Sequence, residues 1–123
     1  YIADNSEIFI DEIVKEINLC QEKGFQSICL ICKTEKNSIY LFNKIKHKLD
    51  IQLIKNGSVS DLQGVFILPV YMSKGLEFDA VLICDADSQN YHDEDDKNLL
   101  YVACTRALHK LSLFCENEVS PLI

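Results

Sequence analysis

The stretch Leu68–Asp87, LPVYMSKGLEFDAVLICDAD, holds two apolar runs on either side of a polar turn. The runs VFILPVY (Val65–Tyr71) and AVLIC (Ala80–Cys84) are short and rich in β-branched residues, as is typical of strands buried on both faces of a parallel sheet. The turn between them, Ser73–Glu77 (SKGLE), combines a cation, a glycine and an acid. Ligands of open α/β sheets bind outside the carboxyl ends of the strands. The turn is therefore a candidate site, and an ordinary solvated loop is the alternative that these five residues leave open.

Length, composition and charge limit the class of protein. The chain has 123 residues, of which 48% are hydrophobic and 25% charged, so we expect one folded domain over residues 1–123. Its net charge is −7, whereas a domain that grips nucleic acid unaided is usually basic. Strong binding of DNA or RNA by this chain alone is therefore disfavoured. The chain begins with Tyr1 rather than Met, and we expect it to be a piece of a longer protein.

The six cysteines lie mostly inside apolar runs, where cysteine behaves as a small hydrophobic residue. Cys29 and Cys32 match C-x-x-C, but residues three apart on a strand point to opposite faces. No second pair completes a zinc site. Buried, reduced thiols are the prediction, and they suit a reducing cytoplasm. No apolar run approaches the roughly 20 residues of a membrane span, and no signal peptide is visible, so we expect a cytoplasmic protein with no membrane partner.

Hydrophobic periodicity predicts alternating helices and strands. In order, the expected elements are a helix from a cap at Asn5 or Ser6 to Lys23, a strand Ser27–Cys32, a helix Glu35–Leu49 capped by Thr34, a short strand Ile51–Ile54, a turn Asn56–Ser58, a strand ending at Tyr71, a strand Ala80–Cys84, an acidic loop Gln89–Lys97, a helix Asn98–Leu108 and a strand Lys110–Cys115. The expected apolar stripes are Phe9, Ile10, Ile13, Ile17 and Cys20 on the first helix, and Ile39, Phe42, Ile45 and Leu49 on the second. This order predicts a three-layer α/β domain around a mainly parallel sheet.

The phosphate-binding loops common in such folds are absent. Neither G-x-x-x-x-G-K-[ST] nor G-x-G-x-x-G occurs among the four glycines, so the domain cannot hold a nucleoside triphosphate by the usual loop. If a nucleotide is involved, this domain completes a site built mostly elsewhere. A calcium loop through Asp85, Asp87 and Asp96 fails on chemistry, because Asn90 stands where the turn needs glycine. No metal site is predicted.

The segment Asn98–Leu108, NLLYVACTRAL, is the second informative one. Helical spacing points Leu99, Val102, Ala103 and Leu108 toward a core. Arg106 is a cation within this small-residue, apolar segment. A surface salt bridge is the ordinary interpretation. An arginine on a rigid helix beside a sheet edge can also stabilise charge on a transferring phosphoryl group, as an arginine finger does.

Read together, the segments resemble superfamily 1 helicases of the UvrD/Rep type. YMSKGLEFDAVLI is similar to motif V of that family, LLYVACTRAL to motif VI, and SICLICKTEKNS (Ser27–Ser38) to the motif IV region. The order and spacing agree over about Ser27–Cys115. The resemblance implies the second, C-terminal RecA-like domain of such a motor, with a P-loop only in the first domain. PVYMSKGLEFDAVLI and YVACTRALHKL resemble the HelD branch most, whose members associate with bacterial RNA polymerase and recycle it.

The resemblance also implies roles for individual residues. Arg106 matches the arginine finger of motif VI, which reaches the γ-phosphate bound by the first RecA-like domain. Lys74, Gly75 and Glu77 match motif V, near the phosphates and ribose, and are expected ATP contacts. Lys33 stands where the family usually has a motif IV arginine that acts on the γ-phosphate. Lysine keeps the charge there but loses the bidentate fork.

Other positions depart from the family pattern. Cys32 stands where an aromatic residue often stacks on adenine. Tyr71 replaces a histidine of motif V that contacts DNA, Pro69 replaces a threonine, and Ser73 follows in the same segment; Tyr71 and Ser73 are the expected nucleic-acid contacts.

The expected function is that of the C-terminal motor domain of an ATP-dependent DNA helicase or translocase. ATP with Mg²⁺ would be held mainly by a first RecA-like domain of the same protein, which is the expected partner together with DNA. The alternatives are a HelD-type ATPase that recycles RNA polymerase in a bacterial cytoplasm, and a non-catalytic α/β interaction module that kept the motifs only as structure.

Overall fold

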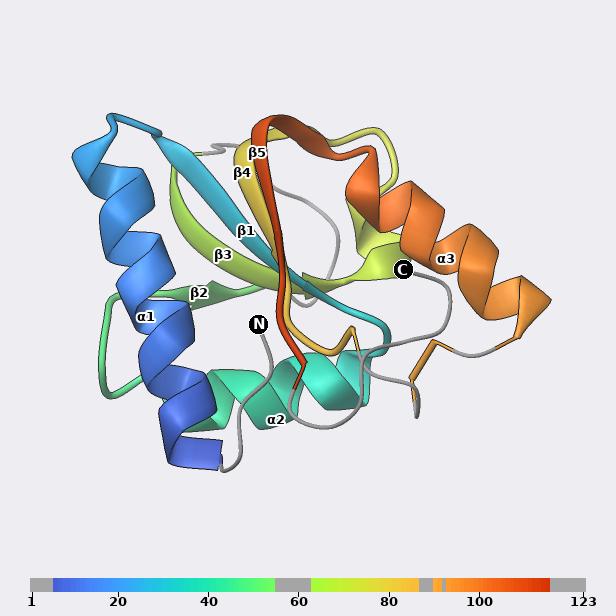
Figure 1. Ribbon diagram of the computed structural model, residues 1–123, viewed down its shortest axis with the longest axis horizontal. Coiled ribbons are helices and arrows are strands. Elements are labelled where there is room, and N and C mark those ends of the chain that lie inside the picture. Colours follow the sequence, from blue (N-terminus) through green and yellow to red (C-terminus); the bar gives the residue numbers. More distant parts are fainter. Residues whose placement is uncertain (1–5, 55–62, 87–89, 92, 116–123) are drawn as a thin grey trace.

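The computed structural model describes residues 6–54, 63–86, 90–91 and 93–115. Its elements are α1 (Ser6–Glu22), β1 (Ser27–Cys32), α2 (Glu35–Ile45), β2 (Gln52–Leu53), β3 (Gly64–Pro69), the 3₁₀ helix η1 (Val70–Ser73), β4 (Phe78–Ile83), α3 (Glu94–Cys104) and β5 (Ala107–Leu113). The five strands form one sheet in the order β2-β3-β1-β4-β5, and every neighbouring pair is parallel (Figure 1). The predicted parallel α/β architecture is confirmed.

The centre of the sheet is the apolar strand β1. It pairs with β3 on one side and with β4 on the other, so that Ile28 lies opposite both Val65 and Ala80. Five of its six residues are buried, which explains why its sequence is continuously apolar instead of alternating. The strand has the bounds that the sequence predicts.

Each face of the sheet carries its own hydrophobic core. One core joins α1 and α2 to Ile28, Leu30 and Cys32 of β1. The other joins α3 and η1 to Cys29 and Ile31 of the same strand. Figure 1 shows α1 and α3 on opposite sides of the sheet. This arrangement is the predicted three-layer domain.

The first helix agrees with its prediction and the second agrees only in part. All five residues of the α1 stripe are buried, and the helix is followed by Gly24 at φ +87°. Asn5 and the predicted turn Asn56–Ser58 lie outside the described residues. The hydroxyl of Thr34 caps α2 by accepting from the N–H of Asn37 at 3.1 Å.

The predicted end and inward face of α2 need correction. The helix ends at Ile45 instead of Leu49. Its buried residues are Ser38, Leu41 and Ile45, whereas Ile39 is exposed. The small Ser38 can turn inward because its hydroxyl donates to the carbonyl of Thr34 at 3.0 Å.

The last helix begins earlier and ends earlier than predicted. The carboxylate of Asp93 caps α3 by accepting from the N–H of Asp96, and the carboxylate of Asp96 accepts from the N–H of Asp93. The acidic run therefore forms a capping box and the first helical turn instead of a loop. At the other end the chain leaves the helix after Cys104. Leu108 therefore lies on β5 and is exposed, and His109 is a strand residue, not the end of a helix.

The stretch around the polar turn changes direction in two steps. Pro69 ends β3, and Tyr71 belongs to η1 instead of the strand. Pro69 can occupy this position because it lies at the strand's last residue, where a missing N–H costs little pairing. From η1 the chain passes through Gly75, at φ +80°, into β4.

Candidate functional site

The parallel sheet separates the expected site residues onto two edges. Gly75 and Glu77 precede β4 and Arg106 precedes β5, so these three lie at the amino edge of the sheet. Lys33 follows β1 and Tyr71 follows β3, so these two lie at the carboxyl edge. A strand of six residues spans about 20 Å. The structure thus brings Arg106 together with Glu77 and places Lys33 on the far edge.

Arg106 lies in the turn between α3 and β5. Its backbone is held on both sides: its N–H donates to the carbonyl of Ala103 at 3.2 Å, and its carbonyl accepts from the N–H of Phe78 at 2.9 Å. The side chain is half-buried, and its Nε is buried without a hydrogen-bond partner in the part of the chain that the structure describes. A buried donor without a partner costs free energy, which an acceptor brought by a ligand or another domain would recover.

The turn before β4 offers exposed groups beside this arginine. Lys74, Gly75 and Glu77 are exposed, and the N–H of Leu76 closes the turn on the carbonyl of Ser73 at 3.0 Å. The hydrogen bond from Phe78 to Arg106 joins this turn directly to the α3–β5 turn. A cation, a carboxylate and a glycine with positive φ therefore lie at the same edge of the sheet as the half-buried Arg106.

The two expected nucleic-acid contacts differ in accessibility. Tyr71 is 60% exposed, and its hydroxyl donates to the carboxylate of Glu35 at 3.3 Å. Ser73 is fully buried, and its hydroxyl donates to the carbonyl of Val70 at 2.6 Å. Only Tyr71 offers its side chain to a ligand in this conformation.

Lys33 forms a different constellation at the carboxyl edge. Its ammonium group pairs with the carboxylate of Asp96 at 2.6 Å, and its backbone N–H donates to Asp85 at 2.8 Å. The amide of Asn37 donates both to Asp85 at 2.8 Å and to Asn90 at 2.9 Å. Asp96 was not expected from the sequence to have a side-chain role. The available signal was the spacing of two aspartates three residues apart, which matches a capping box with Asp in place of Glu.

Two of the three aspartates in the rejected calcium loop are thus engaged with nitrogen donors. Asp85 accepts from Lys33 and Asn37, and Asp96 pairs with Lys33. Asp87 lies outside the described residues. Within the described ranges no group of three or more His, Cys, Asp or Glu side chains is placed to hold a metal ion.

Asp79 is a second structural acid that sequence reasoning missed. Its carboxylate accepts from the N–H groups of Gln26 at 2.9 Å and Ser27 at 3.3 Å, which fixes the entrance of β1 against β4. The hydrogen bond from Gln26 is the main cause that lowers the pKa of Asp79. His109 lies 3.9 Å from the other carboxylate oxygen and stacks on Phe25.

The cysteines are free thiols, and five of the six are buried. Burial raises the pKa of Cys29, Cys32 and Cys84 well above the usual value, so these thiols stay protonated and unreactive. Cys32 is 1% exposed, so its side chain cannot act as a platform for a base. The interpretation as buried hydrophobic thiols is confirmed for five cysteines, whereas Cys104 is half-buried.

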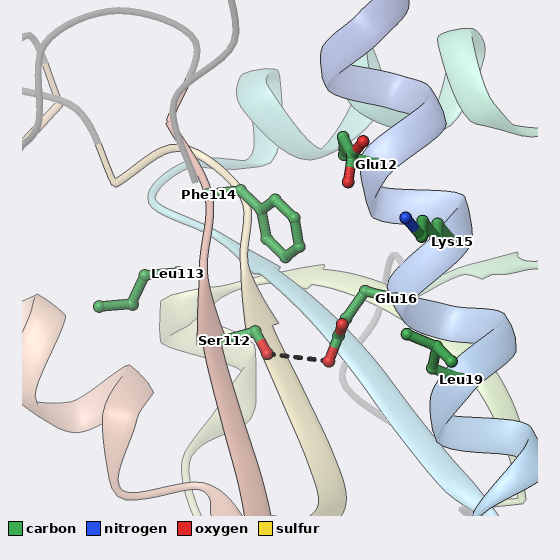
Figure 2. A pocket seen from close by; sticks show the side chains of 7 residues that line it. All are labelled: Glu12, Lys15, Glu16, Leu19, Ser112, Leu113 and Phe114. Atoms are coloured by element: carbon green, nitrogen blue, oxygen red, sulfur yellow. Dashed lines mark hydrogen bonds between the residues drawn. The ribbon is translucent and has the colours of Figure 1, made fainter.

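A surface hollow of about 460 Å³ lies between α1 and β5 (Figure 2). Its lining residues are Glu12, Lys15, Glu16, Leu19, Ser112, Leu113 and Phe114. At its floor the carboxylate of Glu16 accepts from the hydroxyl of Ser112 at 3.2 Å and pairs with Lys110 at 2.6 Å. The nearby carboxylate of Glu16 raises the pKa of Lys110. None of the expected site residues lines this hollow.

Comparison with known proteins places the chain in a family. Residues 64–114 match the family described as the UvrD-like helicase C-terminal domain. The crystal structure of the C-terminal domain of a possible DNA helicase from Lactobacillus plantarum WCFS1 is similar over 98% of this chain and 74% of that one, with 30% identity and a TM-score of 0.89. The chain belongs to the UvrD-like helicase C-terminal domain family. No curated protein sequence gives a significant match.

More distant structures share the RecA-like fold of this UvrD-like domain. The C-terminal domain of the DEAD-box protein Dbp5 is 13% identical, with a TM-score of 0.65 over 95% of this chain and 75% of that one. An arterivirus nonstructural protein 10 helicase, solved with DNA, is 15% identical, with a TM-score of 0.53; the match covers 98% of this chain and 30% of that one. As a separate finding, none of the helices in the described ranges is long and apolar enough to cross a membrane.

Proposed function

We propose that this UvrD-like domain is the C-terminal motor domain of an ATP-dependent helicase or translocase that acts on DNA in a bacterial cytoplasm. In this proposal ATP with Mg²⁺ is bound mainly by a first RecA-like domain of the same protein, because the present chain has no phosphate-binding loop. The bound nucleotide supplies the phosphoryl group whose hydrolysis drives movement. The amino edge of the sheet then faces that first domain.

The Nε of Arg106, buried and without a partner among the described residues, is the observation that carries the proposal. A permanently charged guanidinium with an unsatisfied donor fits a phosphate oxygen, which is a strong acceptor. The backbone bonds to Ala103 and Phe78 hold the turn, so only the side chain of Arg106 has to move when another domain closes on it. Glu77 is exposed on the same edge and is available to accept from a ribose hydroxyl.

Steady-state ATP hydrolysis by the full-length protein tests this assignment. Replacing Arg106 with Ala should lower kcat by about 10³- to 10⁵-fold, the range known for arginine fingers, while nucleotide binding persists. Lys97→Ala, an exposed cation on α3, is the matched control and should leave the rate unchanged. An Arg106→Ala rate equal to the wild-type rate would remove the arginine from the site and favour a non-catalytic interaction module.

The acidic character of the chain favours a second candidate, a HelD-type ATPase that recycles RNA polymerase with little strand separation. The net charge of −7 opposes strong contact with a phosphate backbone. Ser73 is turned inward, and the hydroxyl of Tyr71 is engaged with Glu35, which leaves little of this segment for DNA. A pull-down of the full-length protein separates the two: RNA polymerase subunits support the recycling ATPase, and nucleic acid alone supports the helicase.

A further inference from the structure

Lys33 and Asp96 form a largely buried ion pair at the first turn of α3. The two charged groups are 2.6 Å apart, and their side chains are 22% and 7% exposed. Screening by water is weak for such a pair, and each partner needs the other to offset its lost hydration. Lys33 is therefore occupied by an internal carboxylate instead of being held ready at the surface.

The backbone of Lys33 is held by Asp85, whose carboxylate is itself fixed by a second segment. The backbone N–H of Lys33 donates to Asp85, which follows β4. Asn37, in the first turn of α2, donates to the same carboxylate and to Asn90. The backbone of Lys33 is thus fixed at the end of β1, and its side chain extends to Asp96 on α3.

The acidic partner sits at one end of α3, and Arg106 follows the other end. Asp96 is in the first turn of α3, and Arg106 comes two residues after its last residue, Cys104. A helix of 11 residues is about 16 Å long. Besides Asp96, its buried side chains are Leu100 and Ala103, and the partly buried Leu99, Val102 and Cys104 pack against the same core. This packing holds one face of α3 on the sheet, and the ion pair of Asp96 anchors its first turn.

We propose that the Lys33–Asp96 ion pair positions Arg106 for phosphoryl transfer by fixing the direction of α3. Lys33 and Asp96 are then positioning residues that act from the opposite edge of the sheet, and neither touches the nucleotide. The inference rests on the proposed role of Arg106. It replaces a direct γ-phosphate contact for Lys33, which lies about 20 Å from the amino edge.

Steady-state ATP hydrolysis by the full-length protein tests the inference with the variants Lys33→Met, Asp96→Asn and the exchanged pair Lys33→Asp with Asp96→Lys. Each single variant should lower kcat by on the order of 10- to 100-fold, the scale of an ångström-sized displacement at a reacting centre, with KM for ATP changed little. The exchanged pair should recover part of the loss. Asp95→Asn, an exposed acid in the same helical turn, should behave as wild type.

The same variants in an Arg106→Ala background separate positioning from general damage to the fold. If the pair acts through Arg106, Lys33→Met costs no further activity once Arg106 is gone. A further loss there, or normal turnover by Asp96→Asn when Lys33→Met is impaired, would overturn the inference and assign Lys33 a role of its own. Failure of the proposed function is seen separately, as an unchanged rate for Arg106→Ala alone.

Discussion

Replacing Asp96 with alanine should destabilise the domain far more than replacing its neighbour Asp95. The change removes the 2.6 Å ion pair with Lys33 and leaves a lysine that is only 22% exposed without its carboxylate. Exposed pairs contribute about 0–1 kcal/mol and loss of one partner in a buried pair costs about 3–5 kcal/mol, so about 2 kcal/mol is expected for this intermediate case. The lost return bond to Asp93 and the lost charge at the helix N-terminus add about 1 kcal/mol.

Urea denaturation of the 123-residue chain, followed by circular dichroism, measures the difference in free energy of unfolding. The total of about 3 kcal/mol corresponds to a fall in Tm of roughly 10 °C for a domain of this size. Asp95→Ala removes an exposed acid from the same turn and should cost about 0.5 kcal/mol through the helix dipole alone. If the two variants unfold within about 0.5 kcal/mol of each other, the ion pair does not stabilise α3 and the reasoning fails.

Three further predictions concern other parts of the domain. The pKa of Asp79 is lowered in the folded state, chiefly by the N–H of Gln26. The contribution of Asp79 to stability is therefore complete above the unfolded pKa of about 4 and is lost as pH falls through the folded pKa. Asp79→Asn should flatten the decline in unfolding free energy below pH 4, and an unchanged dependence of stability on acid pH would contradict this. Gly75→Ala should lower the free energy of unfolding in urea by about 1–2 kcal/mol, because φ at this position is +80°. An added Cβ meets no atom within 4 Å, so the penalty comes from the backbone alone. Gly75→Asn should lower the free energy of unfolding less, and an equal loss for both variants would point to a different cause. The purified chain alone should not hydrolyse ATP, because it lacks a phosphate-binding loop; turnover that disappears with Arg106→Ala would refute this.

The strands could be predicted because their burial leaves a direct trace in the sequence. SICLIC is apolar at nearly every position since β1 is covered on both faces, and its predicted bounds agree with the structure. The start of α3 was missed because four acidic residues suggest a solvated loop. Asp96 turns inward to Lys33, which is more than 60 residues away in the sequence. A local sequence pattern cannot predict such a long-range partner.

The site residues show what motif order can and cannot predict. Motif resemblance selected Arg106, Gly75 and Glu77, which the fold brings to one edge. It also selected Lys33, which the fold places at the opposite edge. The order of motifs along the chain does not specify which end of a parallel strand a residue follows. Placement of Arg106 on a helix was wrong by two residues, because pairing of Ala107 with Phe78 draws the chain into β5 at once. The difference is important, since the turn fixes the arginine's backbone more tightly than a fraying helix end would.

A structure of the full-length protein with ADP and aluminium fluoride tests the central claim most directly. The complex mimics the transferring phosphoryl group, so it shows which side chains meet the developing charge. We predict that the guanidinium of Arg106 lies within about 3 Å of the fluoroaluminate, with Glu77 on the same side of the nucleotide. A structure in which Arg106 remains turned into its own domain, while another cation contacts the fluoroaluminate, would contradict the account.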